Sequence, residues 1–269
     1  MNSLTAMDTA AIGGIAGAVE VTLQQPTVTM KNFLQQGKPI PLNPKVLYRG
    51  WFVNCASIAP ICCIQFGVNR ALENFLERSG VESSHATLIG TAAAAGVVSS
   101  VVSCPAELVM LHQQKKGGSF ASVSRGVVSE HSARILYRGM LPTVAREALW
   151  VGSYLGLVPV LQDELGKIEP LADSPYTVWA LAASSAGLIG GTLTHPLDSI
   201  KTRMQMNLRA EAVTSASMLA AVREVTREGA LFAGYLPRTA RILGASFILN
   251  TVKAHLGDAL EASRRTTAL

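Results

Sequence analysis

The chain has 269 residues, of which 49% are hydrophobic and only 15% are charged, and its mean hydropathy is +0.30. These values exclude a disordered tail protein, which needs high charge, and they favour a membrane protein over a soluble one. The 23 basic residues exceed the 18 acidic ones but lie mostly between apolar runs, and aromatic residues make up only 6% of the chain, so no nucleic-acid partner is expected.

Six stretches come close to the roughly 20 mostly apolar residues that a helix needs to cross a bilayer. In chain order they cover residues 9–25, 53–76, 85–110, 142–161, 176–204 and 240–256. Several contain single charges or end at a proline followed by polar residues. Such helices need neighbours or a water-filled path to shelter these groups. A soluble amphipathic bundle is the alternative on this pattern alone.

Three segments share one set of landmarks, centred on Pro26, Pro105 and Pro196. Each has a glycine nine residues before the proline and a glutamine nine residues after it: Gly17, Gly96 and Gly187, then Gln35, Gln114 and Gln205. A second landmark glycine follows in each copy: Gly50, Gly139 and Gly234. These offsets predict three helix-loop-helix repeats, 1–80, 81–169 and 170–269. Together they form one all-α membrane domain with six transmembrane helices, in which each proline kinks an odd-numbered helix.

The third copy contains a short charged motif directly after its proline. It reads Pro196-Leu-Asp198-Ser-Ile-Lys201-Thr-Arg203 and resembles the Px[DE]xx[KR]x[KR] signature of the mitochondrial carrier family. The threefold repeat, the second glycine landmark and the length resemble that family over essentially the whole chain. The resemblance implies a solute transporter of the mitochondrial inner membrane that works by alternating access. A peroxisomal or plastid membrane is the alternative location.

In this family, acidic and basic residues after the prolines form a ring of ion pairs that closes the cavity on the matrix side. Here the acid positions hold Val28, Glu107 and Asp198, and the base positions hold Lys31, Met110 and Lys201. The family's pairing rule implies contacts of Val28 with Met110, Glu107 with Lys201, and Asp198 with Lys31. Both missing charges therefore fall in one pair, which can be nearly neutral, whereas losing a single partner would strand a charge. Random decay of the repeat is the alternative. The three glutamines match the family's brace, which hydrogen-bonds below such pairs.

The cytoplasmic motif of the family, [FY][DE]xx[RK], is largely absent. Its expected sites hold Arg70 and Glu73, Pro159 and Gln162, and Ala254 and Gly257, or Lys253 and Leu256 in a register shifted by one. Lys253 with Glu73 is the residual pair that we expect. This loss, and a short first loop with Pro39, Pro41 and Pro44, motivate a second hypothesis. In it, a carrier-like protein has lost transport and serves as a structural or interaction subunit of an inner-membrane complex.

Seven residues beyond the landmark glycines lie Ser57, Arg146 and Arg241, which the resemblance implies are substrate contact points. Arg146 is followed by Glu147, as in carriers of amino acids, where the guanidinium binds a carboxylate and the acid binds an amine. We therefore expect a small amino acid or a related carboxylate as substrate. The alternatives are a snorkelling Arg146, a basic interface of Arg238 with Arg241, and a serine that only packs. Further cavity candidates are Glu20, Gln65, Asn69 and Trp150.

No catalytic residue, metal or cofactor is expected. The cysteines, Cys55, Cys62, Cys63 and Cys104, lie in apolar stretches without metal-ligand spacing, and the five histidines are scattered. The chain also lacks a nucleophile elbow and a phosphate-binding loop, so an enzyme is not expected. The expected partners are a small-molecule solute, membrane lipid such as cardiolipin, and other inner-membrane subunits.

Overall fold

The computed structural model describes residues 6–169, 174–208 and 215–267, and six long helical segments account for most of them. Five of the segments are single α-helices: α1 (Ala6–Gln35), α3 (Trp51–Arg78), α4 (His85–Lys116), α9 (Pro175–Met206) and α11 (Tyr235–Thr267). The remaining segment runs through α6 (Met140–Val151), the π-helix η2 (Gly152–Leu157) and α7 (Val158–Gly166). Shorter helices connect them: α2 (Pro44–Leu47), α5 (Phe120–His131), η1 (Ala133–Tyr137), α10 (Ser215–Arg227) and η3 (Ala230–Phe232).

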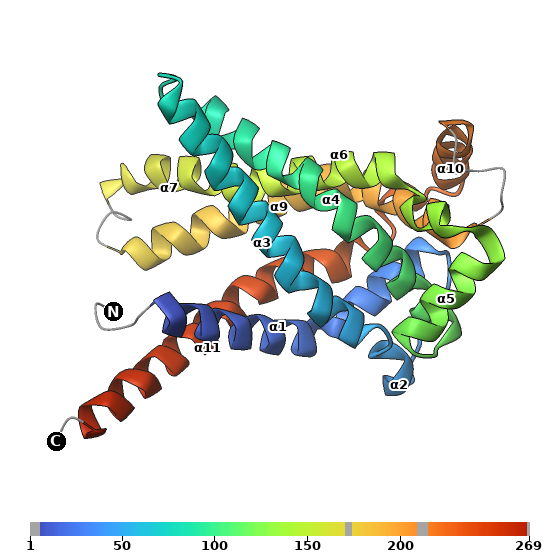
Figure 1. Cartoon of the computed structure of the whole chain (residues 1–269), viewed down its shortest axis with the longest axis horizontal. Helices are drawn as coiled ribbons and strands as arrows, with labels where there is room; N and C mark the ends of the chain where they lie inside the picture. Colours follow the sequence, from blue (N-terminus) through green and yellow to red (C-terminus); the bar gives the residue numbers. More distant parts are fainter. Residues whose placement is uncertain (1–5, 170–173, 209–214, 268–269) are drawn as a thin grey trace.

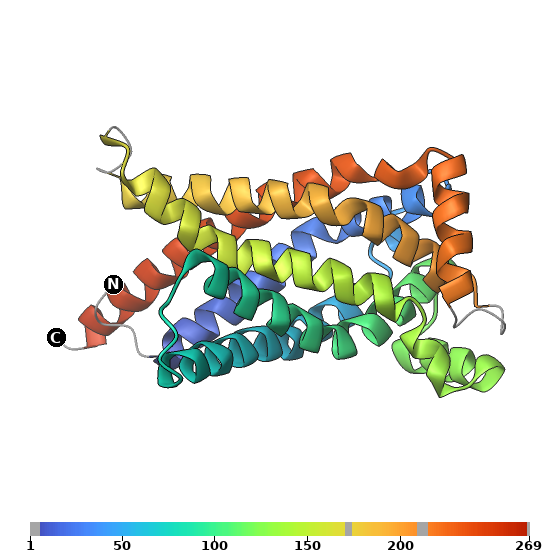
Figure 2. The same cartoon turned by 90° about the horizontal axis from the view of Figure 1, so that it is seen from above.

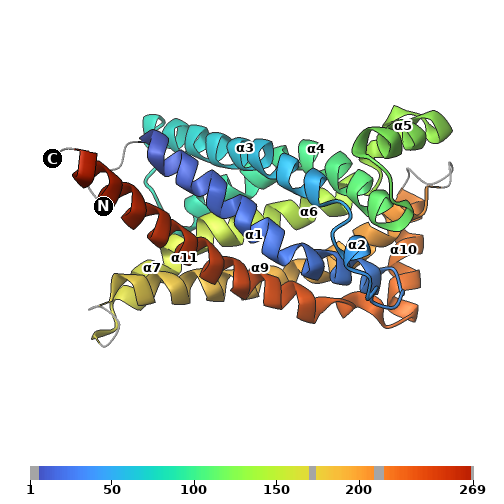
Figure 3. The ribbon, with the colours of Figure 1, turned by 90° about the horizontal axis from the view of Figure 1, so that it is seen from below.

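The long helices lie side by side as an elongated bundle (Figures 1 and 2). The start of α1 and the end of α11 lie at one end, and the short helices α2, α5 and α10 lie at the other (Figures 1 and 3). α1 packs against α11, α3 packs against α4, and the α6–η2–α7 segment packs against α4 and α9. Each predicted repeat thus contributes two long segments joined at the end that carries the short helices.

Many large apolar side chains lie on the surface of the bundle, and much of its interior is polar. Leu23, Leu193 and Leu236 are among the large hydrophobic side chains that are mostly exposed, whereas Glu20, Asp198 and many other polar side chains are buried. A soluble bundle has the opposite arrangement, so this distribution argues against that alternative. By length and composition, three stretches of the described chain could cross a membrane: Pro44–Arg78, His85–Lys116 and Ala133–Gly166.

The first long helix of each repeat, α1, α4 or α9, contains the repeat's proline and continues for about ten residues beyond it. Pro26, Pro105 and Pro196 therefore lie within helices, as the repeats predicted, and α1 extends ten residues beyond the apolar stretch that ends at residue 25. A proline removes one backbone hydrogen bond of its helix. Side-chain contacts next to the proline join the helix to the start of the second long helix of the same repeat. The residue before each proline contacts the carbonyl before a landmark glycine: Gln25 Nε2 to Arg49 O (3.1 Å), Cys104 Sγ to Arg138 O (3.6 Å) and His195 Nε2 to Ala233 O (3.0 Å).

Each landmark glycine lies directly before the second long helix of its repeat, α3, α6 or α11, and contacts the next repeat. Their φ angles are 82°, 77° and 78°, in the left-handed region that glycine adopts without strain. A Cβ on Gly50 would lie 2.8 Å from Met110 Cγ, and one on Gly234 would lie 2.9 Å from Lys31 O. On Gly139 it would lie 3.7 Å from Lys201 Cγ. The three base positions are thus each held beside a landmark glycine.

Two of the three glycines that precede the prolines lie in tight helix contacts, as predicted. A Cβ on Gly96 would collide with the backbone of Glu147, and one on Gly187 would lie 2.7 Å from Ile242 Cγ2. The prediction is wrong for Gly17, where a Cβ would meet no described atom within 4 Å. The close approach between α1 and α11 involves Gly244 instead, because a Cβ there would lie 3.0 Å from Gln24 Oε1.

Replacing Gly96 with alanine is expected to lower the free energy of unfolding by about 1–3 kcal/mol, because α4 and α6 must move apart to admit the methyl group. The same change at Gly90, which lies on the same helix, is the matched control, because a Cβ there would meet no described atom within 4 Å. Thermal unfolding of the purified proteins in detergent measures both. Equal melting temperatures for the two variants would contradict the packing argument.

Candidate functional site

Seven charged side chains from five helices lie together at the level of the prolines, and we call them the charge cluster. Its members are Lys31 on α1, Glu107 on α4, Arg146 and Glu147 on α6, Asp198 and Lys201 on α9, and Arg238 on α11. Their side chains are at most 24% exposed. Charges this far from water must be paired or bind something.

The structure brings the six matrix-side positions together in the combinations that the resemblance implies. Lys31 Nζ donates to Asp198 Oδ2 at 2.7 Å, and Lys201 forms an ion pair with Glu107. Val28 and Met110 pack in an apolar cluster with Val53. One of the three contacts is therefore apolar and two are ionic. Their role as a gate stays a prediction.

Only one of the three glutamines contacts an ion pair. Gln35 Nε2 donates to Asp198 Oδ2 at 3.3 Å. Gln114 instead accepts from Asn32 (2.8 Å), because the Val28–Met110 contact beside it carries no charge. Gln205 donates to the backbone carbonyl of Cys104 (3.3 Å), because both oxygens of Glu107 are already bonded within the charge cluster. Gln114 and Gln205 thus bond a neighbouring repeat rather than an ion pair, and the brace role of the three glutamines stays a prediction.

Arg146 connects the predicted substrate contact to the predicted gate. Its Nη2 donates to Glu147 Oε1 at 2.6 Å and to Glu107 Oε1 at 3.0 Å, and its Nε lies 3.6 Å from Asp198 Oδ1. That Nε is buried and makes no hydrogen bond with any described residue. Because the side chain points into the charge cluster, the alternative of a snorkelling arginine is wrong.

Arg238 is a member of the charge cluster that sequence reasoning missed. Its Nη1 donates to Asp198 Oδ2 at 2.8 Å, its Nη2 donates to Thr194 Oγ1 at 2.6 Å, and its Cζ lies 5.8 Å from the ring centroid of Trp150. It precedes Arg241 by three residues, a spacing that places two side chains on one helix face. That spacing could have identified it, although the sequence alone also allows a basic interface.

Arg241 forms its ion pair outside the charge cluster. Its Nε is 3.6 Å from Glu20 Oε1, which also accepts from Gln24 Nε2 at 2.9 Å. This second pair joins α11 to α1 and brings together two residues that the sequence proposed separately. The first predicted contact point, Ser57, donates to the backbone carbonyl of Asn54 at 3.2 Å, which agrees with the alternative of a serine that only packs or bonds its own helix.

The remaining cavity candidates belong to other contacts. Gln65 Nε2 donates to Ser99 Oγ at 3.2 Å. Asn69 Nδ2 donates to Glu73 Oε1 at 2.8 Å, and Arg70 pairs with Glu73 at 3.2 Å within the same helix. The side chain of Lys253 lies outside the described residues, so its pairing with Glu73 stays a prediction.

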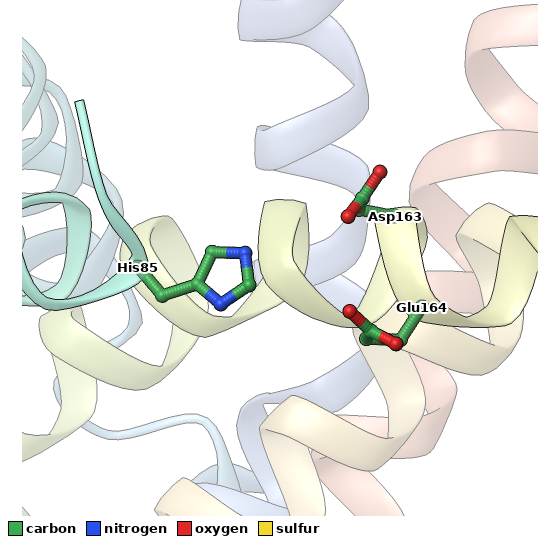
Figure 4. A group of neighbouring side chains, drawn as sticks. All are labelled: His85, Asp163 and Glu164. Atoms are coloured by element: carbon green, nitrogen blue, oxygen red, sulfur yellow. The ribbon is translucent and has the colours of Figure 1, made fainter. Parts of the chain in front are cut away.

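A group of three potential metal ligands lies on the surface between the start of α4 and α7 (Figure 4). The ligand atoms of His85, Asp163 and Glu164 lie within 4.8 Å of one another. Lys167 Nζ lies 3.0 Å from Asp163 Oδ2 and 2.8 Å from Glu164 Oε1. Because one ammonium group already bonds both carboxylates, we interpret this group as an exposed ion-pair cluster.

Comparison with known proteins identifies relatives of one kind. Residues 82–168 and 173–261 match the family model described as "Mitochondrial carrier protein". An uncharacterized mitochondrial carrier of Schizosaccharomyces pombe is 32% identical, covering 89% of this chain and 88% of the relative. A mitochondrial adenine nucleotide transporter of Arabidopsis thaliana is 28% identical (86% and 80%), and a mitochondrial glycine transporter of Saccharomyces cerevisiae is 25% identical (76% and 72%).

Proposed function

Because the chain belongs to the mitochondrial carrier family, whose members are multi-pass transporters of the inner membrane and not enzymes, we propose that it transports a small amino acid or a related small carboxylate. The relatives carry solutes as different as nucleotides, citrate, carnitine and glycine, so the choice rests on the residues of this chain. The predicted contacts with cardiolipin and with other inner-membrane subunits stay predictions.

The contacts of Arg146 carry this proposal. Its guanidinium bonds Glu147 and Glu107 at once, so a ligand carboxylate could replace Glu107 in a charge-assisted bond while a ligand amine took the place of Arg146 on Glu147. Such a ligand satisfies both signs of charge. A ligand with only negative groups would offer Glu147 no positive partner. An unpaired carboxylate in a buried site is costly in free energy.

The same contacts connect ligand binding to the predicted gate. Glu107 bonds both Arg146 and Lys201, so a ligand that withdraws Arg146 from Glu107 weakens the network holding α4, α6 and α9 together. Some of the binding energy would then be available to open the matrix side, as a change between two states requires.

Two substitutions test the amino acid proposal in competition assays of uptake into liposomes. Glu147→Gln should weaken amine-bearing substrates by about tenfold or more while leaving their deaminated analogues within about twofold, because only the amine needs the carboxylate. Arg146→Ala should abolish uptake of both, because each needs its carboxylate held. Glu130→Gln, an exposed carboxylate on α5, is the matched control and should change neither.

Other outcomes would lead to different conclusions. Wild-type protein that prefers ADP or phosphate over every amino acid would overturn the proposal. Absence of transport for all solutes, in protein shown to be folded by a cooperative thermal transition, would instead support the alternative of a transport-inactive subunit.

A further inference from the structure

The charge cluster contains four basic and three acidic side chains, so it carries one excess positive charge. Adding the neighbouring Glu20–Arg241 pair leaves this excess unchanged. An uncompensated charge that is mostly buried is unfavourable, and a bound anion would relieve it. The cluster is therefore matched in charge to a ligand that carries one net negative charge.

The excess positive charge lies around Asp198. Lys31 Nζ and Arg238 Nη1 both donate to the same oxygen, Asp198 Oδ2, at 2.7 and 2.8 Å, and Arg146 approaches the other oxygen. One carboxylate thus faces three cations. At the opposite side of Arg146, Glu147 and Glu107 supply two carboxylates to Arg146 and Lys201.

Donor groups remain available at the side with excess positive charge. An ammonium has three donors and a guanidinium has five. Lys31 makes one side-chain hydrogen bond, to Asp198, and Arg238 makes two, to Asp198 and Thr194, among the described residues. The buried Nε of Arg146, which points to Asp198 and lacks a hydrogen-bond partner in the described structure, is a third donor at this place.

We propose that Arg238 and Lys31 form a second anion-binding position beside the Arg146–Glu147 pair, and that the preferred ligand is an amino acid with a second carboxylate. Its α-carboxylate would bind Arg146, its amine would bind Glu147, and the second carboxylate would bind Arg238 and Lys31. The net charge of such a ligand is −1, which balances the cluster. This inference rests on the proposed transport of an amino acid and specifies its class.

Ligands that differ only in the second carboxylate test the inference. We expect aspartate to bind the purified protein about tenfold or more tightly than asparagine, and glutamate more tightly than glutamine, because the amides match the acids in size but lack the charge. Binding is measured by isothermal titration and by the ligand-induced shift in melting temperature, neither of which requires transport. Succinate, which has two carboxylates and no amine, reports on Glu147.

A substitution then assigns the preference to one residue. Arg238→Gln should reduce the ratio of aspartate to asparagine affinity to about twofold or less while leaving the preference for aspartate over succinate. Arg238→Lys should retain part of the ratio, because it keeps the charge. Arg125→Gln on the exposed face of α5 removes the same charge at a distance and should leave the ratio unchanged.

The outcomes separate this inference from the proposed function. Asparagine that binds as tightly as aspartate to the wild type would overturn the second anion-binding position while leaving amino acid binding intact. Succinate that binds as tightly as aspartate would overturn the amine site, and with it the proposed transport of an amino acid. A ratio unchanged in folded Arg238→Gln protein would reject Arg238 as the specificity residue.

Discussion

Replacing Asp198 with asparagine is expected to lower the free energy of unfolding by about 3–5 kcal/mol, because breaking a buried ion pair from one side leaves the partner charge without compensation. Here the effect is large because Lys31 and Arg238 both depend on the same carboxylate oxygen, and Arg146 approaches the other. Thermal and denaturant unfolding of the purified protein measure the loss.

The matched control is Asp163→Asn on the surface of α7. Asp163 pairs with Lys167 at 3.0 Å, but both side chains are more than half exposed, and such pairs contribute about 0–1 kcal/mol. Adding Lys31→Met to Asp198→Asn should recover part of the stability by removing one of the stranded cations. Asp198→Asn protein as stable as the Asp163→Asn control would contradict the assigned network.

Changing Val28 to aspartate should likewise destabilise the protein, and adding Met110→Lys should recover much of the loss. Val28 and Met110 are buried in one apolar cluster with Val53, so a single carboxylate there has no partner, whereas the double variant recreates the ion pair of the other two repeats. Side chains in direct contact couple by about 0.5–3 kcal/mol. The two single variants, the double variant and the wild type together give the coupling energy.

A lysine introduced at a distant position is the control for this cycle. Ser129 lies on the exposed face of α5, so Ser129→Lys should show no coupling with Val28→Asp. Additive effects for Val28→Asp with Met110→Lys would mean that the two side chains do not interact as the repeats imply. The double variant should also transport more slowly than the wild type, because a third ion pair must break when the matrix side opens.

The sequence by itself determined the features that depend on position along the chain. The equal offsets around Pro26, Pro105 and Pro196 predicted three repeats, and the family rule paired Lys31 with Asp198, because a repeat unit places equivalent residues at equivalent points of a helix. The apolar stretches mark the helix ends less well, because α1 continues ten residues beyond the stretch that ends at residue 25. The first helix passes through Pro26, because the hydrogen bond lost at the proline is offset by the packing of the helix beyond it against the other repeats.

Only the tertiary structure decided where the arginines point. Arg146 could have faced lipid, water or the bundle axis, and Arg238 could have formed a basic surface with Arg241. Their directions depend on the rotation and tilt of α6 and α11, which are set by packing against α4, α9 and α1 rather than by local sequence. The shared use of Asp198 by α1, α9 and α11 follows from that packing, because it joins residues from distant parts of the chain.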